Sequence, residues 1–179
     1  MDRPAAKTLV LPFERQNLEF PAPENPWLFL NAHPLGDQAR WSNCLVCEQG
    51  FRPLFNVLEG NGYNTHPVLE SGPLFAGALV LTSRFKEINK QTVRRAVHAV
   101  RPGAPVLIAG EKTSGIAPLS KWVGASTAIV EKMSKFHAQL IRINADDMAM
   151  KGLNLPTNDP NVGTFGSGKV DVGSALLAS

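Results

Sequence analysis

Four runs of apolar residues divide the chain from residue 27 onward. They cover residues 27–32, 43–49, 77–83 and 104–111, and each ends at polar or turn-forming residues. Runs that are apolar throughout are typical of strands buried on both faces, as in a parallel sheet. We therefore expect these runs to be strands of one parallel sheet.

Helical spacing separates several of these runs. Residues 86–100 give the best example, because four apolar residues share one face and Pro102 and Gly103 then end the helix. The four residues are Val93, Ala96, Val97 and Val100. Shorter helices are expected over residues 52–63 and 118–125. Strands that alternate with helices at this spacing indicate βαβ units.

The later part of the chain has a different pattern. Residues 127–133 and 138–145 alternate more between apolar and polar, which predicts an antiparallel pair with a turn near Lys135 and Phe136. Residues 67–70 are a further candidate for a short strand. The predicted fold class is α/β: a three-layer Rossmann-like sandwich, mostly parallel, with an antiparallel C-terminal hairpin.

The first 26 residues contain five prolines, at positions 4, 12, 21, 23 and 26. We expect residues 1–26 to be a proline-rich arm laid over the domain, with short strands such as residues 8–11. Residues 27–150 are the expected Rossmann-like domain.

Composition favours an ordinary folded domain. Among 179 residues, 44% are hydrophobic and 18% are charged, which argues against disorder. The formal charge of +3 permits nucleic acid as a partner but does not require it. Because no apolar run approaches the length of a membrane span and the first residues lack a secretory pattern, we expect a cytoplasmic protein.

Ligands in such a sheet bind beyond the carboxyl ends of the strands. After the first strand, residues 31–36 contain one glycine and Pro34, which has no N–H donor, whereas a cofactor loop needs several glycines. Glu48 follows the second strand, where an acidic residue can bind a ribose diol. Without a glycine loop before it, Glu48 is better interpreted as a polar residue at a strand end.

Two short motifs suggest other chemistry. Cys44 and Cys47 are spaced as C-x-x-C, but on a strand they would point to opposite faces, so we expect two core residues rather than a redox or zinc site. The "GEKTSG" stretch at residues 110–115 resembles a phosphate loop but lacks the Gly-Lys-Ser/Thr ending. We expect a strand-to-helix turn there. The four histidines are scattered along the chain and suggest no metal site.

The helix over residues 86–100 carries basic residues. Lys90, Arg94 and Arg101 lie along one side of it, and Lys86 stands at its beginning. Such a stripe can contact phosphates, although a solvated helix face has the same pattern.

Several features resemble a known family when they are taken in order. They are a strand ending in a polar and basic turn (residues 82–86), the basic helix, and a strand running into Gly110, Glu111 and Lys112. The closing "TFGSGKVDVGSALLAS" is similar to the family's phenylalanine-led Asp-x-Gly-Ser-x-Leu-Leu segment. Over roughly residues 27–179, the chain resembles the N-terminal domain of bacterial 16S ribosomal RNA guanine-N2 methyltransferases. These belong to the methyltransferase small domain superfamily of class I S-adenosylmethionine-dependent methyltransferases.

The resemblance implies two Rossmann-like methyltransferase folds in tandem. In this family the C-terminal fold binds S-adenosylmethionine and holds the guanine amino group with an Asn-Pro-Pro-aromatic motif. The N-terminal fold is a degenerate copy that helps to bind RNA and supports the catalytic domain. This sequence contains neither Asn-Pro-Pro nor an Asp-x-Gly-x-Gly loop. We therefore expect residues 151–179 to be a connection and the first element of a missing catalytic domain.

On this interpretation the chain alone is inactive, binds no cofactor and has no catalytic residue or metal. S-adenosylmethionine is the cofactor of the parent enzyme. The expected partners are ribosomal RNA or the small ribosomal subunit, and the protein's own C-terminal domain. Phe165 and Asp171 would lie near the cofactor edge of that domain. The expected RNA-binding residues are Lys86, Lys90, Arg94, Arg101 and Lys112.

Two other function classes stay open. The domain could be a protein-interaction or dimerisation module that forms a homodimer and does not touch RNA. It could also be a small-molecule enzyme that uses residues 31–36 and Glu48. Binding of S-adenosylmethionine or nicotinamide nucleotides would favour the enzyme.

Overall fold

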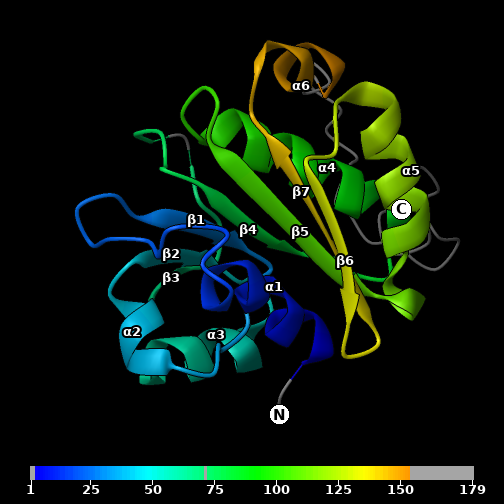
Figure 1. Cartoon of the computed structure of the whole chain (residues 1–179). Coiled ribbons are helices and arrows are strands. Elements are labelled where there is room, and N and C mark those ends of the chain that lie inside the picture. The colour runs from blue at the N-terminus through cyan, green and yellow to red at the C-terminus, as the bar shows by residue number, and fades with distance from the viewer. Residues whose placement is uncertain (1–2, 71, 154–179) are drawn as a thin grey trace, which may run out of the picture.

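The computed structural model describes residues 3–70 and 72–153, which form a seven-stranded sheet with helices on both faces (Figure 1). The strand order is β3-β2-β1-β4-β5-β7-β6. The first five strands in this order run parallel, while β7 is antiparallel to β5 and to β6. The strands are β1 (Trp27–Leu30), β2 (Leu45–Glu48), β3 (Asn64–His66), β4 (Ala78–Leu81), β5 (Pro105–Glu111), β6 (Glu131–Lys135) and β7 (Ala138–Asn144).

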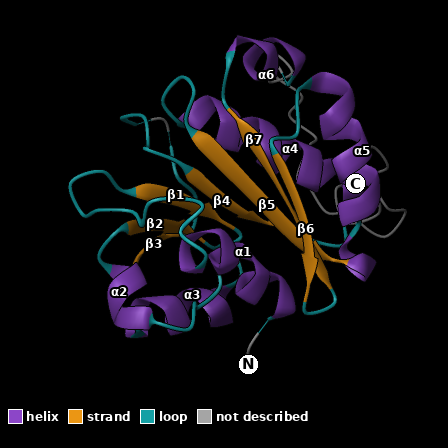
Figure 2. Cartoon of the chain, viewed as in Figure 1, coloured by secondary structure: helices purple, strands orange, loops and turns teal. Residues whose placement is uncertain are grey.

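The helices divide into two layers, which Figure 2 shows on either side of the sheet. The core cluster on one face joins α1 and single residues of α2 and α3 to the sheet, and the cluster on the other face joins α4, α5 and α6 to it. The helices are α1 (Pro4–Glu14), α2 (Gln38–Ser42), α3 (Arg52–Gly60), α4 (Lys86–Ala99), α5 (Ile116–Ser126) and α6 (Asp147–Gly152), with a 3-10 turn η1 (Lys112–Ser114). These layers confirm the predicted three-layer α/β architecture.

The central strands are apolar throughout because both faces are covered. In β1, Leu28 and Leu30 belong to the cluster under α4, while Trp27 and Phe29 belong to the cluster under α1. All four residues are buried. A strand exposed on one face would alternate instead, and its sequence would not be a continuous apolar run.

The predicted C-terminal hairpin is confirmed, although its first strand begins later than expected. Phe136 and His137 form the turn with φ angles of 52° and 60°. Positive φ at both central residues is the geometry that matches the twist of a tight hairpin. Because Ala138 pairs with Glu111, this turn lies beside the carboxyl end of β5.

Two strand predictions are wrong. Residues 8–11, expected as a short strand, lie inside α1. Pro4 stands in the first turn, where a missing N–H costs nothing, and Pro12 lies inside the last turn, only two residues before the helix ends at Glu14. Residues 67–70 are not a strand, since Pro67 follows β3 directly and cannot continue the ladder as a donor.

The sequence patterns also missed α2 and α6. Each is short and has an aspartate at its N-cap, Asp37 and Asp146, whose side chain accepts a hydrogen bond from a backbone N–H three residues later. Within the described residues, no helix has the length and apolar character needed to cross a membrane.

Candidate functional site

The strand order creates one topological switch point, between β1 and β4. From these two neighbours the chain proceeds outward in opposite directions, through β2 and β3 on one side and β5 on the other. Open α/β sheets bind ligands in the crevice beyond the carboxyl ends of the strands at such a point. Here the turn after β1 begins at Asn31 and the turn after β4 begins at Thr82.

Asn31 ties the two turns together. Its Nδ2 donates to the carbonyl oxygen of Leu81 at 2.8 Å, across the switch point. Asn31 has a φ angle of 54°, a left-handed conformation that asparagine tolerates better than most residues. The side chain of Asn31 therefore holds the turn after β1 against the end of β4.

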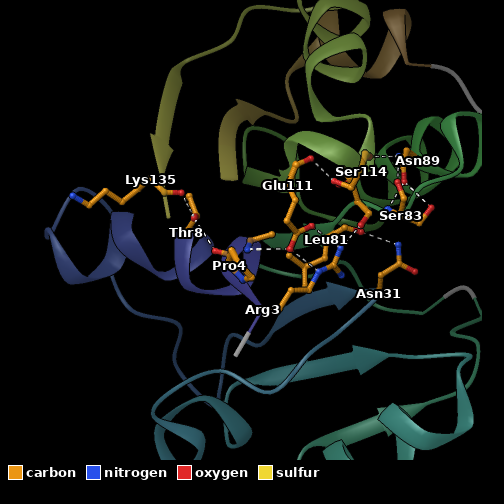
Figure 3. Close-up of polar contacts among 12 residues, drawn as sticks. Arg3, Pro4, Thr8, Asn31, Leu81, Ser83, Asn89, Glu111, Ser114 and Lys135 are labelled. Atoms are coloured by element: carbon orange, nitrogen blue, oxygen red, sulfur yellow. Dashed lines mark hydrogen bonds and ion pairs between the residues drawn. The ribbon is translucent and has the colours of Figure 1, made fainter. Parts of the chain in front are cut away.

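Arg3 reaches the same place from the residue before α1, as Figure 3 shows. Its Nη2 donates to the carbonyl oxygen of Thr82 at 2.6 Å and to Oε2 of Glu111 at 3.1 Å, and its Nε donates to Oε1 at 3.0 Å. The backbone N–H of Ala5 donates to the same carboxylate at 3.3 Å. Burial alone would raise the pKa of Glu111, but the hydrogen bonds and charge of Arg3 outweigh it and lower that pKa.

A second polar network joins the turns after β4 and β5 to α4. The hydroxyls of Thr82 and Ser114 are hydrogen-bonded at 2.6 Å. A Cβ on Gly110 would lie 1.9 Å from the Thr82 hydroxyl oxygen, so the pair packs directly over that glycine. Asn89, buried on α4, accepts from the N–H of Ser83 at 2.7 Å and donates to the carbonyl oxygens of Ser83 and Ser114.

Glu48, the candidate ribose ligand, is already bound within the protein. Nη1 of Arg95 donates to Oε1 at 2.8 Å, and Nη2 of Arg95 donates to Oε2. The backbone N–H of Leu69 also donates to Oε2, at 2.7 Å. The side-chain hydrogen bonding of Arg95 to Glu48 raises the pKa of Arg95, although burial acts in the opposite direction.

A cavity of about 350 Å³ lies beside the switch point rather than in it. It lies between α1 and the turn after β1, and its lining includes Phe13, Trp41 and Gly36. Arg3 lines one side, while Asn31 and Thr82 do not reach it. At the switch point itself, Asn31 and Arg3 are hydrogen-bonded to the carbonyl oxygens of Leu81 and Thr82.

His33 follows Asn31 and Ala32 in the turn after β1. Burial lowers the pKa of His33, and the charge of Arg3 lowers it further, while Glu111 acts in the opposite direction. Its imidazole is therefore neutral over a wider pH range than that of an exposed histidine.

Cys44 and Cys47 are free and buried, as expected for core residues. The expectation that they point to opposite faces is wrong, because Cys44 precedes β2 and both belong to the cluster under α1. Burial raises the pKa of Cys44 to about 11 and that of Cys47 further still. Within residues 3–70 and 72–153, no group of three His, Cys, Asp or Glu residues could hold a metal ion.

The five basic residues expected to bind RNA do not form one stripe. Lys86 and Lys112 are exposed at the carboxyl edge, at the start of α4 and of η1. Arg101 follows the other end of α4, where its Nη1 donates to Oδ1 of Asn25 at 3.0 Å. At 1.5 Å per residue, Arg101 lies roughly 22 Å along the helix from Lys86.

Lys90 and Arg94 lie between these ends and face α5. Nζ of Lys90 lies 5.8 Å, and Cζ of Arg94 5.1 Å, from the ring centre of Trp122. Lys90 also forms an ion pair with Glu87 at 3.0 Å. These two side chains are half-buried in the contact between α4 and α5, unlike Lys86 and Lys112.

Sequence patterns did not single out Arg3, which the structure places at the centre of the candidate site. Its only local signal is that it precedes Pro4, a residue that favours the start of a helix. Phe165 and Asp171, expected near a cofactor edge, lie outside the described residues.

Neither a protein-family model nor a curated protein sequence matches this chain. Solved structures do. The T. thermophilus 16S rRNA N2 G1207 methyltransferase (RsmC), solved with AdoMet and guanosine, matches with a TM-score of 0.66 and 17% identity. That match covers 98% of this chain and 51% of RsmC, so the chain spans about half the length of that protein.

Other methyltransferases share the fold more distantly. The N-methyltransferase NodS from Bradyrhizobium japonicum matches with a TM-score of 0.53 and 12% identity, over 76% of this chain and 98% of NodS. A ribosomal protein L11 methylase from Lactobacillus delbrueckii subsp. bulgaricus matches with a TM-score of 0.57 and 10% identity, over 75% of this chain and 74% of that chain. At these identities the matches establish the predicted Rossmann-like methyltransferase fold and nothing finer.

Proposed function

We propose that this chain is the non-catalytic N-terminal domain of an S-adenosylmethionine-dependent rRNA guanine-N2 methyltransferase. It assists RNA binding and supports a C-terminal catalytic domain. The proposal is supported by the similarity to RsmC, which covers nearly all of this chain but only half of that protein. The comparisons do not favour the alternative of a protein-interaction module without RNA.

The non-catalytic role is supported by one observation: the polar groups that a cofactor would need at the switch point are hydrogen-bonded within the protein. A nucleotide cofactor needs a glycine-rich turn whose backbone can approach it, and a free carboxylate for the ribose. Here Asn31 fixes the turn after β1, Arg3 occupies the carbonyl that follows β4, and Arg95 holds the carboxylate of Glu48. These residues do not fit S-adenosylmethionine, so we derive no reaction step at this edge.

The proposed RNA role rests on exposed positive charge. Lys86 and Lys112 are exposed at the carboxyl edge, so they are the strongest phosphate ligands of the five expected residues. Lys90 and Arg94 lie against the ring of Trp122, which leaves less of their side chains for RNA. Arg101 would contact only an RNA that extends along α4. Phe165 and Asp171 are proposed to lie near the cofactor edge of the C-terminal catalytic domain.

Titration with a single-stranded rRNA fragment tests this function. Binding is expected to weaken steeply between about 50 and 200 mM salt, and the salt slope should fall by roughly 0.7 for each phosphate contact that a variant loses. Lys86→Glu with Lys112→Glu should weaken binding, whereas Lys121→Glu, an exposed control on α5, should not. Absence of binding at low salt, or equal effects of both variants, contradicts the RNA role.

Calorimetry with S-adenosylmethionine tests the other half of the proposal. We expect no measurable heat of specific binding to the chain. The carboxylate of Glu48 is already bound by Arg95, and the turn after β1 is already held by the hydrogen bond from Asn31 to Leu81. Micromolar binding would contradict the non-catalytic assignment. The same titration with a nicotinamide nucleotide tests the small-molecule enzyme.

A further inference from the structure

Three aromatic side chains are exposed within the described part of the chain. They are Phe51, Phe85 and Phe136, which are 61%, 48% and 44% exposed. All three lie at the carboxyl edge of the sheet: Phe51 after β2, Phe85 after β4 and Phe136 in the β6–β7 turn beside the end of β5. The other large exposed hydrophobic residues of this part are aliphatic.

Each of these rings has an exposed cation next to it in the sequence: Arg52, Arg84 with Lys86, and Lys135. Two of the cations also contact the ring beside them. Cζ of Arg84 lies 5.0 Å from the ring centre of Phe85, and Nζ of Lys135 lies 5.9 Å from that of Phe136. Lys112 adds a further exposed positive charge at the end of β5. The edge therefore alternates aromatic rings with cations.

Folding does not explain two of these rings. Phe51 and Phe85 occupy the N-cap positions of α3 and α4 and make no side-chain capping bond. Serine, threonine, aspartate or asparagine stabilises a helix at that position, and an exposed phenylalanine does not. An apolar ring in water at a position that favours a polar residue points to a partner outside the domain.

Three carboxylates of this edge are neutralised by ion pairs. Glu48 is paired with Arg95, and Glu111 is paired with Arg3. Glu87, in the first turn of α4, is paired with Lys90. The cations beside the exposed rings face solvent, and the two carboxylates at the ends of β2 and β5 do not offset their charge.

The spacing of the rings suits an extended strand of nucleotides. Two strand steps separate β2 from β4, and two separate β4 from β7. At about 4.8 Å for each step, the rings follow strand ends roughly 10 Å apart, over roughly 20 Å of edge. Proteins that bind single-stranded nucleic acids combine a basic surface with aromatic rings on which bases stack.

We propose that Phe51, Phe85 and Phe136 stack on unpaired bases of RNA while the adjacent cations contact its phosphates. This inference rests on the proposed RNA role and names its ligand as a single-stranded, not a duplex, segment. A protein partner would use the rings as apolar surface only, so leucine would replace phenylalanine without loss. Base stacking needs the flat face of the ring.

The experiment uses the full chain and an unpaired RNA of about 12 nucleotides carrying one 2-aminopurine, whose fluorescence reports stacking. One variant changes all three phenylalanines to leucine, and a second changes them to tyrosine. Val130→Ala is the control, since Val130 is 49% exposed and immediately precedes β6 at the end opposite the hairpin turn. Thermal melting checks that each variant is folded. We expect all of them to fold, because the substituted side chains are exposed and pack little against the core.

The leucine variant is expected to bind roughly 5- to 150-fold more weakly for each ring that stacks, and to lose the 2-aminopurine response. The tyrosine variant and Val130→Ala should bind the single-stranded RNA as tightly as the wild type does. A duplex of equal length should bind to these three proteins more weakly than the single strand. Wild-type affinity in the leucine variant overturns the stacking but leaves the proposed RNA role intact. Failure of the wild type to bind RNA at low salt overturns both.

Discussion

Arg3 should contribute more to stability than any exposed cation of this domain, and Arg3→Ala tests this. The arginine and Glu111 side chains are 23% and 22% exposed, which places the pair between a surface and a buried ion pair. Exposed pairs contribute about 0–1 kcal/mol, and loss of one partner of a buried pair costs about 3–5 kcal/mol. We expect Arg3→Ala to lower the free energy of unfolding by about 2 kcal/mol.

Urea denaturation measures this change, and thermal melting should show a midpoint lower by roughly 4–8 °C. Arg84→Ala is the matched control, because Arg84 is exposed and should change the stability by less than about 0.5 kcal/mol. Arg3→Lys keeps the charge but not the fork that reaches both Thr82 and the carboxylate, so it should recover only part of the loss.

The pH dependence separates the ion pair from simple packing. The folded pKa of Glu111 lies below its ordinary value, so the pair contributes its full stability above the unfolded pKa of about 4.3 and loses it as the pH falls through the folded pKa. The stability difference between wild type and Arg3→Ala should shrink over that range. A difference that is constant with pH, or a double-mutant cycle with Glu111→Gln that gives no coupling, would refute the reasoning.

Three other changes test the filled edge. Gly110→Ala should destabilise the domain by about 2–4 kcal/mol in urea denaturation, because the added Cβ would meet the Thr82 hydroxyl at 1.9 Å and disrupt its hydrogen bond; a stable variant would contradict this packing. Glu48→Gln should cost about 1–2 kcal/mol by the same assay, since Arg95 is 39% exposed and can turn toward water once its partner is neutral; no change would mean that the pair is not formed. The thiol of Cys44, with a pKa raised to about 11, should react with a thiol reagent at pH 8 only at the rate of unfolding; rapid labelling would show that it is accessible.

The sheet could be predicted from the sequence because its signal is local. The runs at β1, β4 and β5 are apolar throughout, and only strands covered on both faces need such runs. The N-terminal helix α1 was missed because five prolines in 26 residues suggest irregular structure. Position decides the effect of each proline, and at Pro4 it favours a helix.

The candidate site could be located but not described. The order of strands and turns predicts that ligands approach the carboxyl edge, and it places Glu48 there. The contact between Arg3 and Glu111 joins residues 108 positions apart, so no local pattern encodes it. The exposure of Phe51 and Phe85 could not be predicted from the sequence either. Phenylalanine is ordinarily expected in the core, and only the packing of the fold shows that these two rings face solvent.

The two ion pairs at the strand ends bear on both proposals, that the chain binds no nucleotide cofactor and that it binds RNA. Arg3 comes from one helical layer and Arg95 from the other, and each neutralises a carboxylate at a strand end. A cofactor that binds through its ribose needs a free carboxylate, whereas a polyanion is repelled by one. Removing Arg95 alone would free Glu48 but would leave Asn31 bonded across the switch point. Arg95→Ala should therefore weaken RNA binding by restoring a negative charge to the edge, without producing binding of S-adenosylmethionine.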